Sequence, residues 1–480
     1  MDRVTFRCRL TGPAVPLPHF WEHTVGSCHA PLALRADWQA QLRRCHEELG
    51  FCHVRFHGLL CDDVGTLVAY KDRLVHSFFN ADRICDYLLS IGMRPFVELS
   101  FMPQALASGP TTVFHYRANV TPPRDYGQWA ALVGKLVAHW VERYGAAEVR
   151  AWFFEVWNEP NLARFWDGTR DDYFRLYEAT VRAVKAVDAG LRVGGPASAN
   201  NEWLGEFLDH CAANRLPADF VSTHHYPNDV PGYEAADTET QLAHGRRGML
   251  RDWTERARGQ ARGLPLYYTE WNTSSDVRDP RHDEPYAGAF AVKTVLEANG
   301  LVDAYSWWAF TDIFEEDYFP SVPFHGGFGL LNLHGIAKPT YRAFQLLHRL
   351  GTELLAVEGS HDTVDAWVIK DRASATVVLS NHALPRHPIQ GQRVRIRLEE
   401  AGSPLAAHVE RIDEDHANAK RLWRDMGAPE YLSAEDVDRL HRASALVREN
   451  QPCRSEGGTV HLECDLPPHA VAAIILQFAP

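Results

Sequence analysis

The stretch Phe153-Phe154-Glu155-Val156-Trp157-Asn158-Glu159-Pro160-Asn161-Leu162 shows the plan on which much of the chain is built. The apolar and aromatic run Val149–Glu159 predicts a buried strand, and Pro160 ends it because proline cannot donate to a sheet ladder. Apolar residues between 173 and 187 then recur every three or four positions, which predicts a helix. A strand followed by a helix is the repeating unit of a parallel sheet.

The same unit recurs along most of the chain. The predicted strands are His19–Thr24, His53–His57, Arg94–Phe101, Val149–Glu159, Arg192–Ala197, Phe220–Tyr226, Pro265–Thr273 and Asp303–Thr311. Eight such units close naturally into a barrel. The alternative is an open doubly wound sheet, which usually carries a Gly-rich phosphate turn after its first strand, and the sequence shows none. We therefore predict an α/β fold, a (β/α)8 TIM barrel over residues 15–350.

After about residue 351 the pattern changes to strands with no helix between most of them. These strands are Thr363–Lys370, Ala375–Ser380, Val394–Leu398, Thr459–Cys464 and Val471–Phe478. The segment Val4–Leu10 alternates in the same way, so we expect residues 1–14 and 351–480 to form an accessory β-sandwich domain. A helical insertion near 418–450 interrupts it, where Ser433 and Asp436 have the spacing of a capping box.

Charge, hydropathy and cysteine content restrict the class of protein. The formal net charge of −13 argues against a nucleic-acid partner, because phosphate binding needs a basic surface. The sequence contains no run of 18 apolar residues, so it predicts no membrane span. Its N-terminus lacks the apolar region of a secretory signal. The nine cysteines show no C-x-x-C pair and no disulfide framework. We expect reduced thiols and a cytoplasmic location.

Two glutamates stand at the ends of predicted strands. Glu159 ends strand four, and Glu270 ends strand seven within Tyr267–Asn272. Reacting groups in such barrels lie at the carboxyl ends of the strands, and glycoside hydrolysis needs two carboxyl groups on either side of the scissile bond. Strict alternation would place Glu155 and Trp157 on the same strand face as Glu159. The pair predicts a glycoside hydrolase.

The two glutamates need different protonation states. A general acid must stay protonated, so the pKa of Glu159 must be raised, by burial and by the negative charge of Glu270. The aromatic residues expected to bury it are Trp157, Phe165 and Trp166. The nucleophile must stay ionised, and Arg55 and Tyr226 are expected to donate hydrogen bonds to Glu270.

Four strings in the chain resemble glycoside hydrolase family 39, on its β-xylosidase branch. They are Arg55–Gly58, Glu155–Leu162, Tyr268–Trp271 and Phe314–Leu330. That family holds β-xylosidases and α-L-iduronidases, which are retaining (β/α)8 barrels. The resemblance covers most of residues 15–350. It implies Glu159 as general acid/base and Glu270 as nucleophile. We expect no metal, because the histidines lack convergent spacing, and no cofactor.

The resemblance also implies residues that surround the sugar. In the pattern His224–Tyr226, the tyrosine would hydrogen-bond the nucleophile. His57 and Glu315 match positions that contact the sugar in the minus-one subsite, and Trp308 matches the platform beneath it. The amide of Asn158 suits a sugar hydroxyl, typically the 2-OH. The residues expected to bind substrate are therefore Arg55, His57, Asn158, His224, Tyr226, Trp308 and Glu315.

We expect a β-D-xylosidase that releases xylose from the non-reducing ends of β-1,4-xylo-oligosaccharides with retention. An α-L-iduronidase or an arabinosidase with the same carboxylate pair is the alternative. An iduronidase must also bind a carboxylate, yet Lys and Arg are absent from Thr223–Asn228 and from Thr311–Gly329. An alternative of a different class is a non-catalytic carbohydrate-binding protein.

Other motifs in the chain carry weaker signals. His46-Glu47-Glu48 lacks the second histidine of H-E-x-x-H, so no zincin site is expected. Glu98, at the end of strand three, is a rival carboxylate. Members of family 39 can associate, so a homo-oligomer is open to the chain, with the 418–450 insertion as a candidate contact. An ordinary surface element is the alternative for that insertion.

Overall fold

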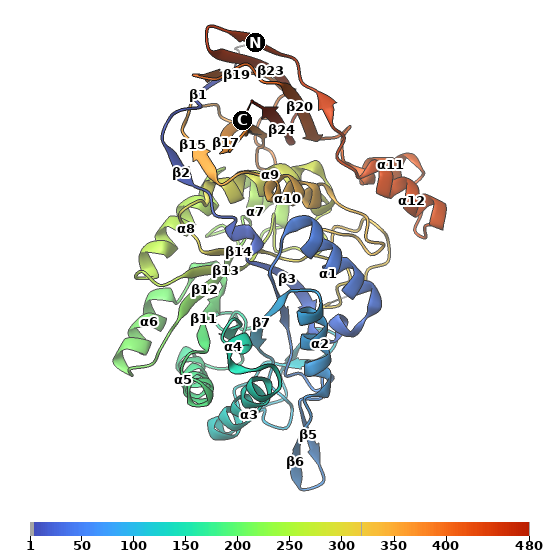
Figure 1. The fold of residues 1–480 in the computed structure, drawn as a ribbon. Coiled ribbons are helices and arrows are strands. Elements are labelled where there is room, and N and C mark those ends of the chain that lie inside the picture. Colours follow the sequence, from blue (N-terminus) through green and yellow to red (C-terminus); the bar gives the residue numbers. More distant parts are fainter. Residues whose placement is uncertain (1–3, 318, 480) are drawn as a thin grey trace.

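Eight parallel strands close into a barrel in the computed structural model, which describes residues 4–317 and 319–479. Residues 1–3 and 480 of the predicted sandwich region, and residue 318 of the predicted loop after strand eight, lie outside the described residues. The barrel strands are β3 (Thr24–His29), β4 (His53–His57), β7 (Arg94–Leu99), β10 (Phe153–Val156), β11 (Arg192–Ser198), β12 (Phe220–His225), β13 (Leu266–Trp271) and β14 (Ala304–Trp307). β14 pairs with β3, so the predicted (β/α)8 barrel is confirmed (Figure 1).

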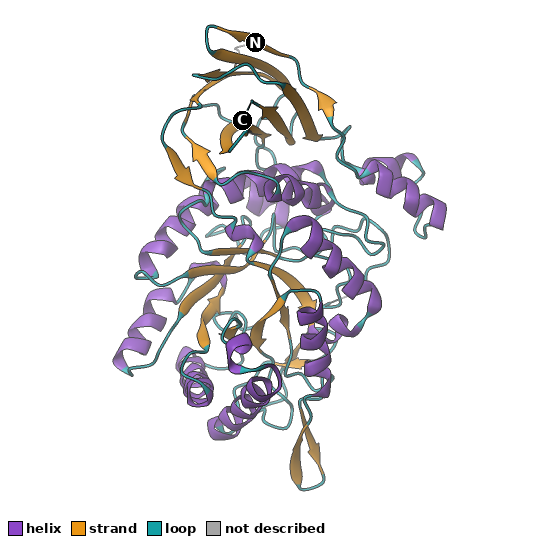
Figure 2. Cartoon of the chain, in the orientation of Figure 1, coloured by secondary structure: helices purple, strands orange, loops and turns teal. Residues whose placement is uncertain are grey.

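Helices surround the barrel on its outside (Figure 2). They include α1 (Ala36–Leu49), α2 (Phe79–Ser90), α3 (Tyr126–Tyr144), α4 (Ala146–Val149), α5 (Arg170–Val187), α6 (Leu204–Ala213), α7 (Thr238–His244), α8 (Met249–Gln260), α9 (Pro285–Glu297) and α10 (Pro339–His348). Asp125 caps α3 by accepting from two backbone N–H groups of its first turn. Thr169 and Asp172 form a capping box that starts α5. The buried side chains of both helices recur every three or four residues and face the strands.

The first barrel strand lies later in the chain than the sequence pattern indicates. The prediction of a strand at His19–Thr24 is wrong, because this segment contains the short 3-10 helix η1 (Phe20–Glu22) and the strand begins only at Thr24. A Cβ atom on Gly26, in the middle of that strand, would lie 2.4 Å from Cε3 of Trp308. The close approach of the indole requires glycine there, so the strand lacks the apolar run that marks the others.

The amino-terminal end of the barrel is filled with rings. Phe96, Phe153, Phe220 and Tyr267 form one cluster near the beginnings of their strands. His23 and His53 stack on each other, and the His23 ring also contacts Phe153. Because this end is filled, space for a ligand remains only at the carboxyl ends of the strands.

The segments outside the barrel form two further sheets. One has the order β16-β1-β19-β23-β22, and the other β2-β15-β17-β18-β24-β20-β21. Their bounds are β1 (Val4–Arg9), β2 (Ala14–Pro16), β15 (Glu353–Leu355), β16 (Val357–Glu358), β17 (Val364–Asp371), β18 (Ser374–Asn381), β19 (Gln392–Glu399), β20 (Ala406–Ile412), β21 (Glu449–Asn450), β22 (Cys453–Glu456), β23 (Thr459–Leu466) and β24 (Ala470–Gln477). Side chains from both sheets, including Phe6, Ile396, Val377 and Ile474, share one core. β1 runs parallel to β19, as part of this assembly.

The helical segment between β20 and β21 contacts the barrel. It contains α11 (Ala419–Asp425) and α12 (Ala434–Ala443), and the predicted capping box of Ser433 and Asp436 is present. Trp423 packs on Phe324, which lies in the loop between β14 and α10. The ammonium of Lys420 donates to the backbone oxygen of Pro280 over 2.8 Å. The segment therefore supports a loop at the open end of the barrel.

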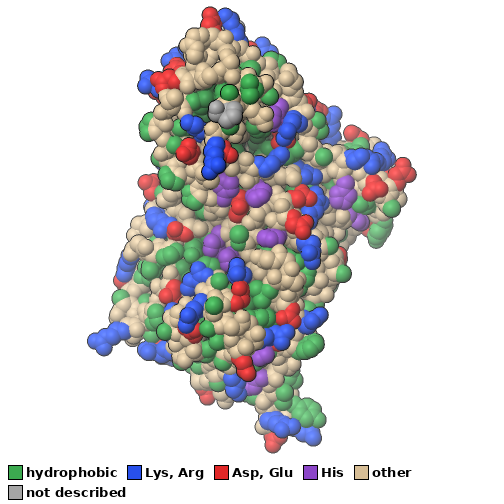
Figure 3. Space-filling model, in the orientation of Figure 1, with side chains coloured by type: hydrophobic (Ala, Val, Ile, Leu, Met, Phe, Trp, Pro, Cys, Tyr) green, Lys and Arg blue, Asp and Glu red, His purple; other side chains and the backbone are tan. Residues whose placement is uncertain are grey.

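Smaller elements complete the described chain. These are the hairpins β5 (Leu67–Tyr70) with β6 (Arg73–His76) and β8 (Thr112–Val113) with β9 (Ala118–Asn119), and the 3-10 helices η2 (Ala30–Leu34), η3 (Ala199–Asn201) and η4 (Pro280–Asp283). The β5–β6 hairpin projects from the barrel, and Figure 3 shows apolar and charged side chains together at its tip. Among the described residues, no helix has the length and apolar character needed to cross a membrane.

Candidate active site

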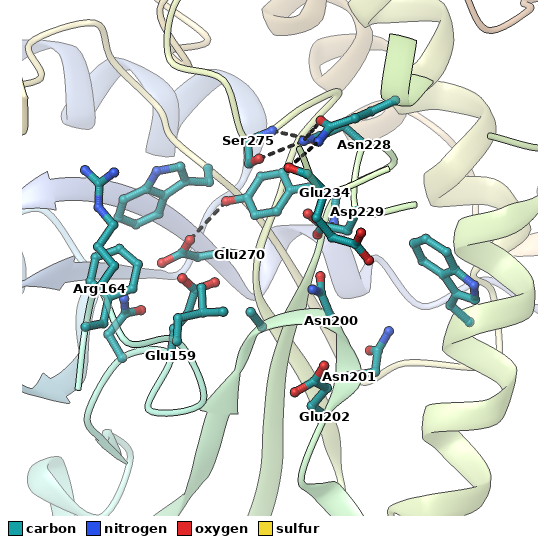
Figure 4. A pocket seen from close by; sticks show the side chains of 18 of the residues that line it. Glu159, Arg164, Asn200, Asn201, Glu202, Asn228, Asp229, Glu234, Glu270 and Ser275 are labelled. Carbon is teal, nitrogen blue, oxygen red and sulfur yellow. Dashed lines mark hydrogen bonds between the residues drawn. The ribbon is translucent and has the colours of Figure 1, made fainter. Parts of the chain in front are cut away.

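A cavity of about 820 Å³ opens at the carboxyl ends of the barrel strands. Glu159 and Glu270 both line it, as do His57, Asn158, Tyr226 and Trp308. Figure 4 shows the two glutamates pointing toward one another across this space. Both glutamates predicted from the strand ends therefore lie in one pocket.

Glu159 reaches the pocket through a turn rather than by strand alternation. Strand β10 ends at Val156, and both Trp157 (φ 73°) and Glu159 (φ 44°) have left-handed backbone conformations. The prediction that Trp157 shares the face of Glu159 is wrong, because this turn sends its indole to the backbone oxygen of Phe165. Of these two residues, Glu159 lines the cavity and Trp157 does not, and the Glu159 backbone N–H donates to the Ala197 carbonyl oxygen over 2.8 Å.

Two donors hold the carboxylate of Glu270. Nη1 of Arg55 pairs with its Oε1 over 2.7 Å, and the Tyr226 hydroxyl donates to its Oε2 over 3.0 Å. The predicted contacts of Arg55 and Tyr226 with Glu270 are therefore present. Hydrogen bonds and a positive charge stabilise the ionised form of a carboxylate.

His224 lies between the two carboxylates. Its Nδ1 is 2.9 Å from Oε1 of Glu159 and 3.7 Å from Oε2 of Glu270. One oxygen of each glutamate and this ring nitrogen lie within 4.8 Å of one another. Burial lowers the pKa of His224 to about 4, so the imidazole is neutral at pH 7. It therefore positions Glu159 without adding a charge.

A buried network of charges lies beneath the pocket. The Arg55 guanidinium pairs with Glu98 over 2.8 Å and with Glu155 over 2.6 Å. Glu98 also accepts from Nδ1 of His57 over 2.7 Å. Glu155 is thus held by an arginine, while Glu98, the rival carboxylate, is fully buried and does not line the cavity. Glu98 and Glu155 therefore stabilise the positive charges of Arg55 and His57.

Glu159 and His57 both line the cavity, and both have shifted pKa values. Burial raises the pKa of Glu159 to about 7, although the charges of His57 and Arg55 oppose the shift. Burial alone would lower the pKa of His57, but the carboxylates of Glu98 and Glu270 raise it to about 9. The two shifts keep His57 protonated at neutral pH and extend the pH range over which Glu159 holds its proton.

Not all predicted substrate-binding residues reach the cavity. His57, Asn158, Tyr226 and Trp308 line it. Arg55 and His224 do not, and they contact the two carboxylates instead. Asn158 combines both roles, because its side-chain oxygen also accepts from Nη2 of Arg55 over 3.0 Å.

The prediction for Glu315 needs a correction. Its carboxylate pairs with Arg35 over 2.8 Å and does not line the cavity. The neighbouring Glu316 does, and its Oε1 lies 3.7 Å from Nε2 of His57 with no hydrogen-bond partner among the described residues. The sequence holds two adjacent glutamates in a loop, where strand alternation cannot decide which one points inward. Burial raises the pKa of Glu316 to about 8.

Several residues that line the cavity were not predicted from the sequence. Asn200–Glu202 follow β11, and Asn228 and Asp229 follow β12, so the strand-end rule could have found them. Arg164 follows Glu159 by five positions and pairs with Asp317 over 2.5 Å. Residues of α8 also line the cavity. These are Trp253, Arg256, Ala257 and Gln260. The periodicity of a helix in the sequence does not indicate that one of its faces borders a ligand site.

Within the residues that the structure describes, three groups of donors are spaced closely enough to hold a metal ion. One is the trio of Glu159, His224 and Glu270, and the others are His19 with Glu22 and His348, and His29 with Cys61 and Asp63. In the first trio, Glu270 is already paired with Arg55, which competes for the same carboxylate. We assign no metal to these groups.

Comparison with known proteins identifies relatives along nearly the whole chain. The family model described as "Glycosyl hydrolases family 39" matches residues 8–460. A β-xylosidase of Caldicellulosiruptor saccharolyticus is 47% identical over 464 residues, 95% of each chain. A β-xylosidase of Geobacillus stearothermophilus is 39% identical over 472 residues, 95% of this chain and 92% of the relative. The crystal structure of a monomeric β-xylosidase from Caulobacter crescentus CB15 superposes with a TM-score of 0.87 at 32% identity, covering 99% of this chain and 100% of the other.

Proposed function

The chain belongs to glycoside hydrolase family 39, and we propose that it is a retaining β-D-xylosidase that releases xylose from the non-reducing ends of β-1,4-xylo-oligosaccharides. The observation that carries the proposal is the pair Glu159 and Glu270, which bring one oxygen of each carboxylate within 4.8 Å of the other across one cavity. Retaining enzymes hold their carboxyl groups about 5–5.5 Å apart, and inverting enzymes about 6.5–9.5 Å apart. The sugar is proposed from the two β-xylosidase relatives.

The first step needs an ionised Glu270 and a protonated Glu159. Arg55 and Tyr226 hold the Glu270 carboxylate, which attacks the anomeric carbon. The proton of Glu159 passes to the glycosidic oxygen as the bond to the leaving group breaks. The raised pKa of Glu159, about 7, keeps that proton available near neutral pH.

The second step reverses the roles. Once Glu270 is esterified to the sugar, its negative charge is gone, and Glu159 has lost its proton. Glu159 then takes a proton from a water molecule, which attacks the anomeric carbon and releases xylose with net retention. Oε1 of Glu159 stays within reach of the neutral His224 ring, which holds it at the pocket wall in both steps.

The alternatives in sugar and in class receive less support. An iduronidase must also bind the carboxylate of its sugar, and the two arginines that line the cavity in the described residues are committed or distant. Arg164 is paired with Asp317, and Arg256 lies on α8. These surroundings favour a neutral pentose. A non-catalytic binding protein would not need two carboxyl groups of which one is held ionised by donors and the other has a raised pKa.

Azide rescue tests the two roles and the sugar together. Turnover of an aryl β-D-xyloside should fall strongly in both Glu159→Ala and Glu270→Ala. Added azide should give the β-xylosyl azide with Glu159→Ala, because the glycosyl-enzyme still forms, and the α-xylosyl azide with Glu270→Ala. Aryl iduronide and aryl arabinoside serve as controls for the sugar. Full activity of Glu270→Ala without azide would refute the assignment.

We also propose a cytoplasmic location and leave self-association as a prediction. All nine cysteines are free, which suits a reducing compartment. Fractionation of native cells tests the location. Light scattering of the purified chain tests the oligomeric state, and the 418–450 segment stays the candidate contact.

A further inference from the structure

The cavity is larger than the reacting sugar requires. Pockets of about 300–1,000 Å³ take ligands well above the size of one pentose, and this cavity measures about 820 Å³. The sugar that reacts lies between Glu159 and Glu270. Additional space extends to walls formed by Asn200–Glu202, by Asn228–Pro231 and by helix α8.

One face of α8 forms the far wall. Trp253, Arg256, Ala257 and Gln260 all line the cavity. Their spacing of three, four and seven positions from Trp253 places them on the same side of a helix. The wall therefore combines an aromatic ring, a guanidinium and an amide on one rigid element.

The Trp253 indole packs partly on the barrel core, but it and its two polar neighbours make few specific contacts within the described residues. In the described part of the chain, no aromatic ring contacts the Trp253 indole, no carboxylate pairs with Arg256, and Gln260 makes no side-chain hydrogen bond. Arg258 on the same helix differs, because it binds Asp303 and two backbone oxygens. A half-buried indole beside free donors suits a sugar, whose flat C–H face stacks on the ring while its hydroxyls accept from the donors.

The opposite wall is joined to the loop of the general acid. The Asn161 side chain accepts from the Ala199 backbone over 2.9 Å and donates to Glu202 over 3.2 Å. Figure 4 shows Asn200, Asn201 and Glu202 on the side of Glu159 that lies away from Arg164. A general acid must face the glycosidic oxygen, so the leaving group extends past Glu159 along this wall.

We infer that the space between Asn200–Glu202 and α8 is a binding site for the leaving-group saccharide. Its ligand is a neutral chain of β-1,4-linked xylosyl residues, with Trp253 as stacking platform and Arg256 and Gln260 as donors to its hydroxyls. The inference rests on the proposed function, because the ligand follows from the proposed substrate. It assigns the choice of leaving group to a helix outside the strand-end loops.

The test compares substrates with and without a leaving-group sugar. β-D-Xylosyl fluoride fills only the glycone side, whereas xylotriose also fills the proposed site. Trp253→Ala should lower kcat/KM for xylotriose about tenfold, the factor that corresponds to 1.4 kcal/mol, and leave kcat/KM for the fluoride within about twofold. Trp253→Phe should restore most of the loss, because a ring face remains.

Arg251→Ala is the matched control, since Arg251 is exposed on the same helix and does not line the cavity. It should change neither substrate. Equal losses on both substrates, or no loss on xylotriose, would overturn the inference. If the wild type hydrolysed no xylosyl fluoride, the proposed function would fail instead. Calorimetry of xylotriose binding to wild type and Trp253→Ala would then decide the leaving-group site alone, with equal affinities counting against it.

Discussion

The hydroxyl of Tyr226 donates a hydrogen bond of 3.0 Å to Oε2 of Glu270, on the oxygen that Arg55 does not pair with. The two oxygens of the nucleophile are thus held by different donors from β4 and from the loop after β12. Losing either donor leaves part of a buried charge without compensation.

Tyr226→Phe should lower kcat/KM for an aryl β-xyloside about 10- to 100-fold, because a hydrogen bond to a charged group is worth about 1.5–3 kcal/mol. The ring still fills its place, so the fold should be retained, with a modestly lower melting temperature because the buried carboxylate loses one donor. Steady-state kinetics and a thermal scan on the same preparation check both. An unchanged kcat/KM would show that Arg55 alone holds the nucleophile.

The raised pKa of Glu159 predicts the alkaline side of the pH profile. The first step needs the protonated acid, so kcat/KM should fall as pH rises through about 7. Glu159→Ala on a dinitrophenyl xyloside, which leaves without protonation, should lose this alkaline limb. The measurement is kcat/KM from pH 4 to pH 9 for both proteins. An alkaline limb that persists in Glu159→Ala would assign it to another group.

The His57–Glu98 contact predicts a pH-dependent stability. The folded pKa of His57 is about 9 and its ordinary value is 6.5, so the folded state binds the proton more tightly. The stabilisation is complete below about pH 6.5 and is lost as pH rises through 9. The free energy of unfolding of wild type minus that of His57→Asn should therefore be larger at pH 6 than at pH 9.5. A difference that stays constant with pH would contradict the assigned charge.

Gly26 and Gly205 form a matched pair of substitutions. A Cβ on Gly26 would meet the Trp308 ring at 2.4 Å, whereas a Cβ on Gly205, near the start of α6, would meet nothing within 4 Å. Gly26→Ala should cost about 1–3 kcal/mol of unfolding free energy and lower kcat/KM, because Trp308 must move. Gly205→Ala should leave activity unchanged and stability equal or higher by up to about 1 kcal/mol. Equal stability of the two variants would remove the packing argument.

The positions of the two glutamates could be predicted because strand ends meet at one rim of a parallel barrel. Glu159 and Glu270 lie far apart in sequence, yet the strand count alone brings them to a common edge. The contact of Tyr226 with Glu270 also followed from its place in the chain. In these cases the strand ends bring the residues to one rim, and short turns after β10 and β12 complete the placement of Glu159 and Tyr226.

The other predictions were wrong where a loop or a close packing contact, rather than a strand end, sets the position of a residue. The strand containing Gly26 lacks an apolar run, because Trp308 occupies the place of its side chain. The left-handed residues Trp157 and Glu159 break the alternation on which their shared face depended. The choice between Glu315 and Glu316 depended on an ion pair with Arg35 that only the folded chain reveals. The domain bounds 15–350, 1–14 and 351–480 stay predictions.

The parallel pairing of Val4 with Val394 has a consequence for how the protein is made. During synthesis, β1 leaves the ribosome long before β19 exists, so its edge has no partner while the barrel is completed. The sheet it belongs to can close only after both flanks of the barrel sequence have emerged. A ribosome that stalls within the barrel region therefore leaves β1 without its partner strand, and a protease that attacks unfolded ends would remove truncated chains first.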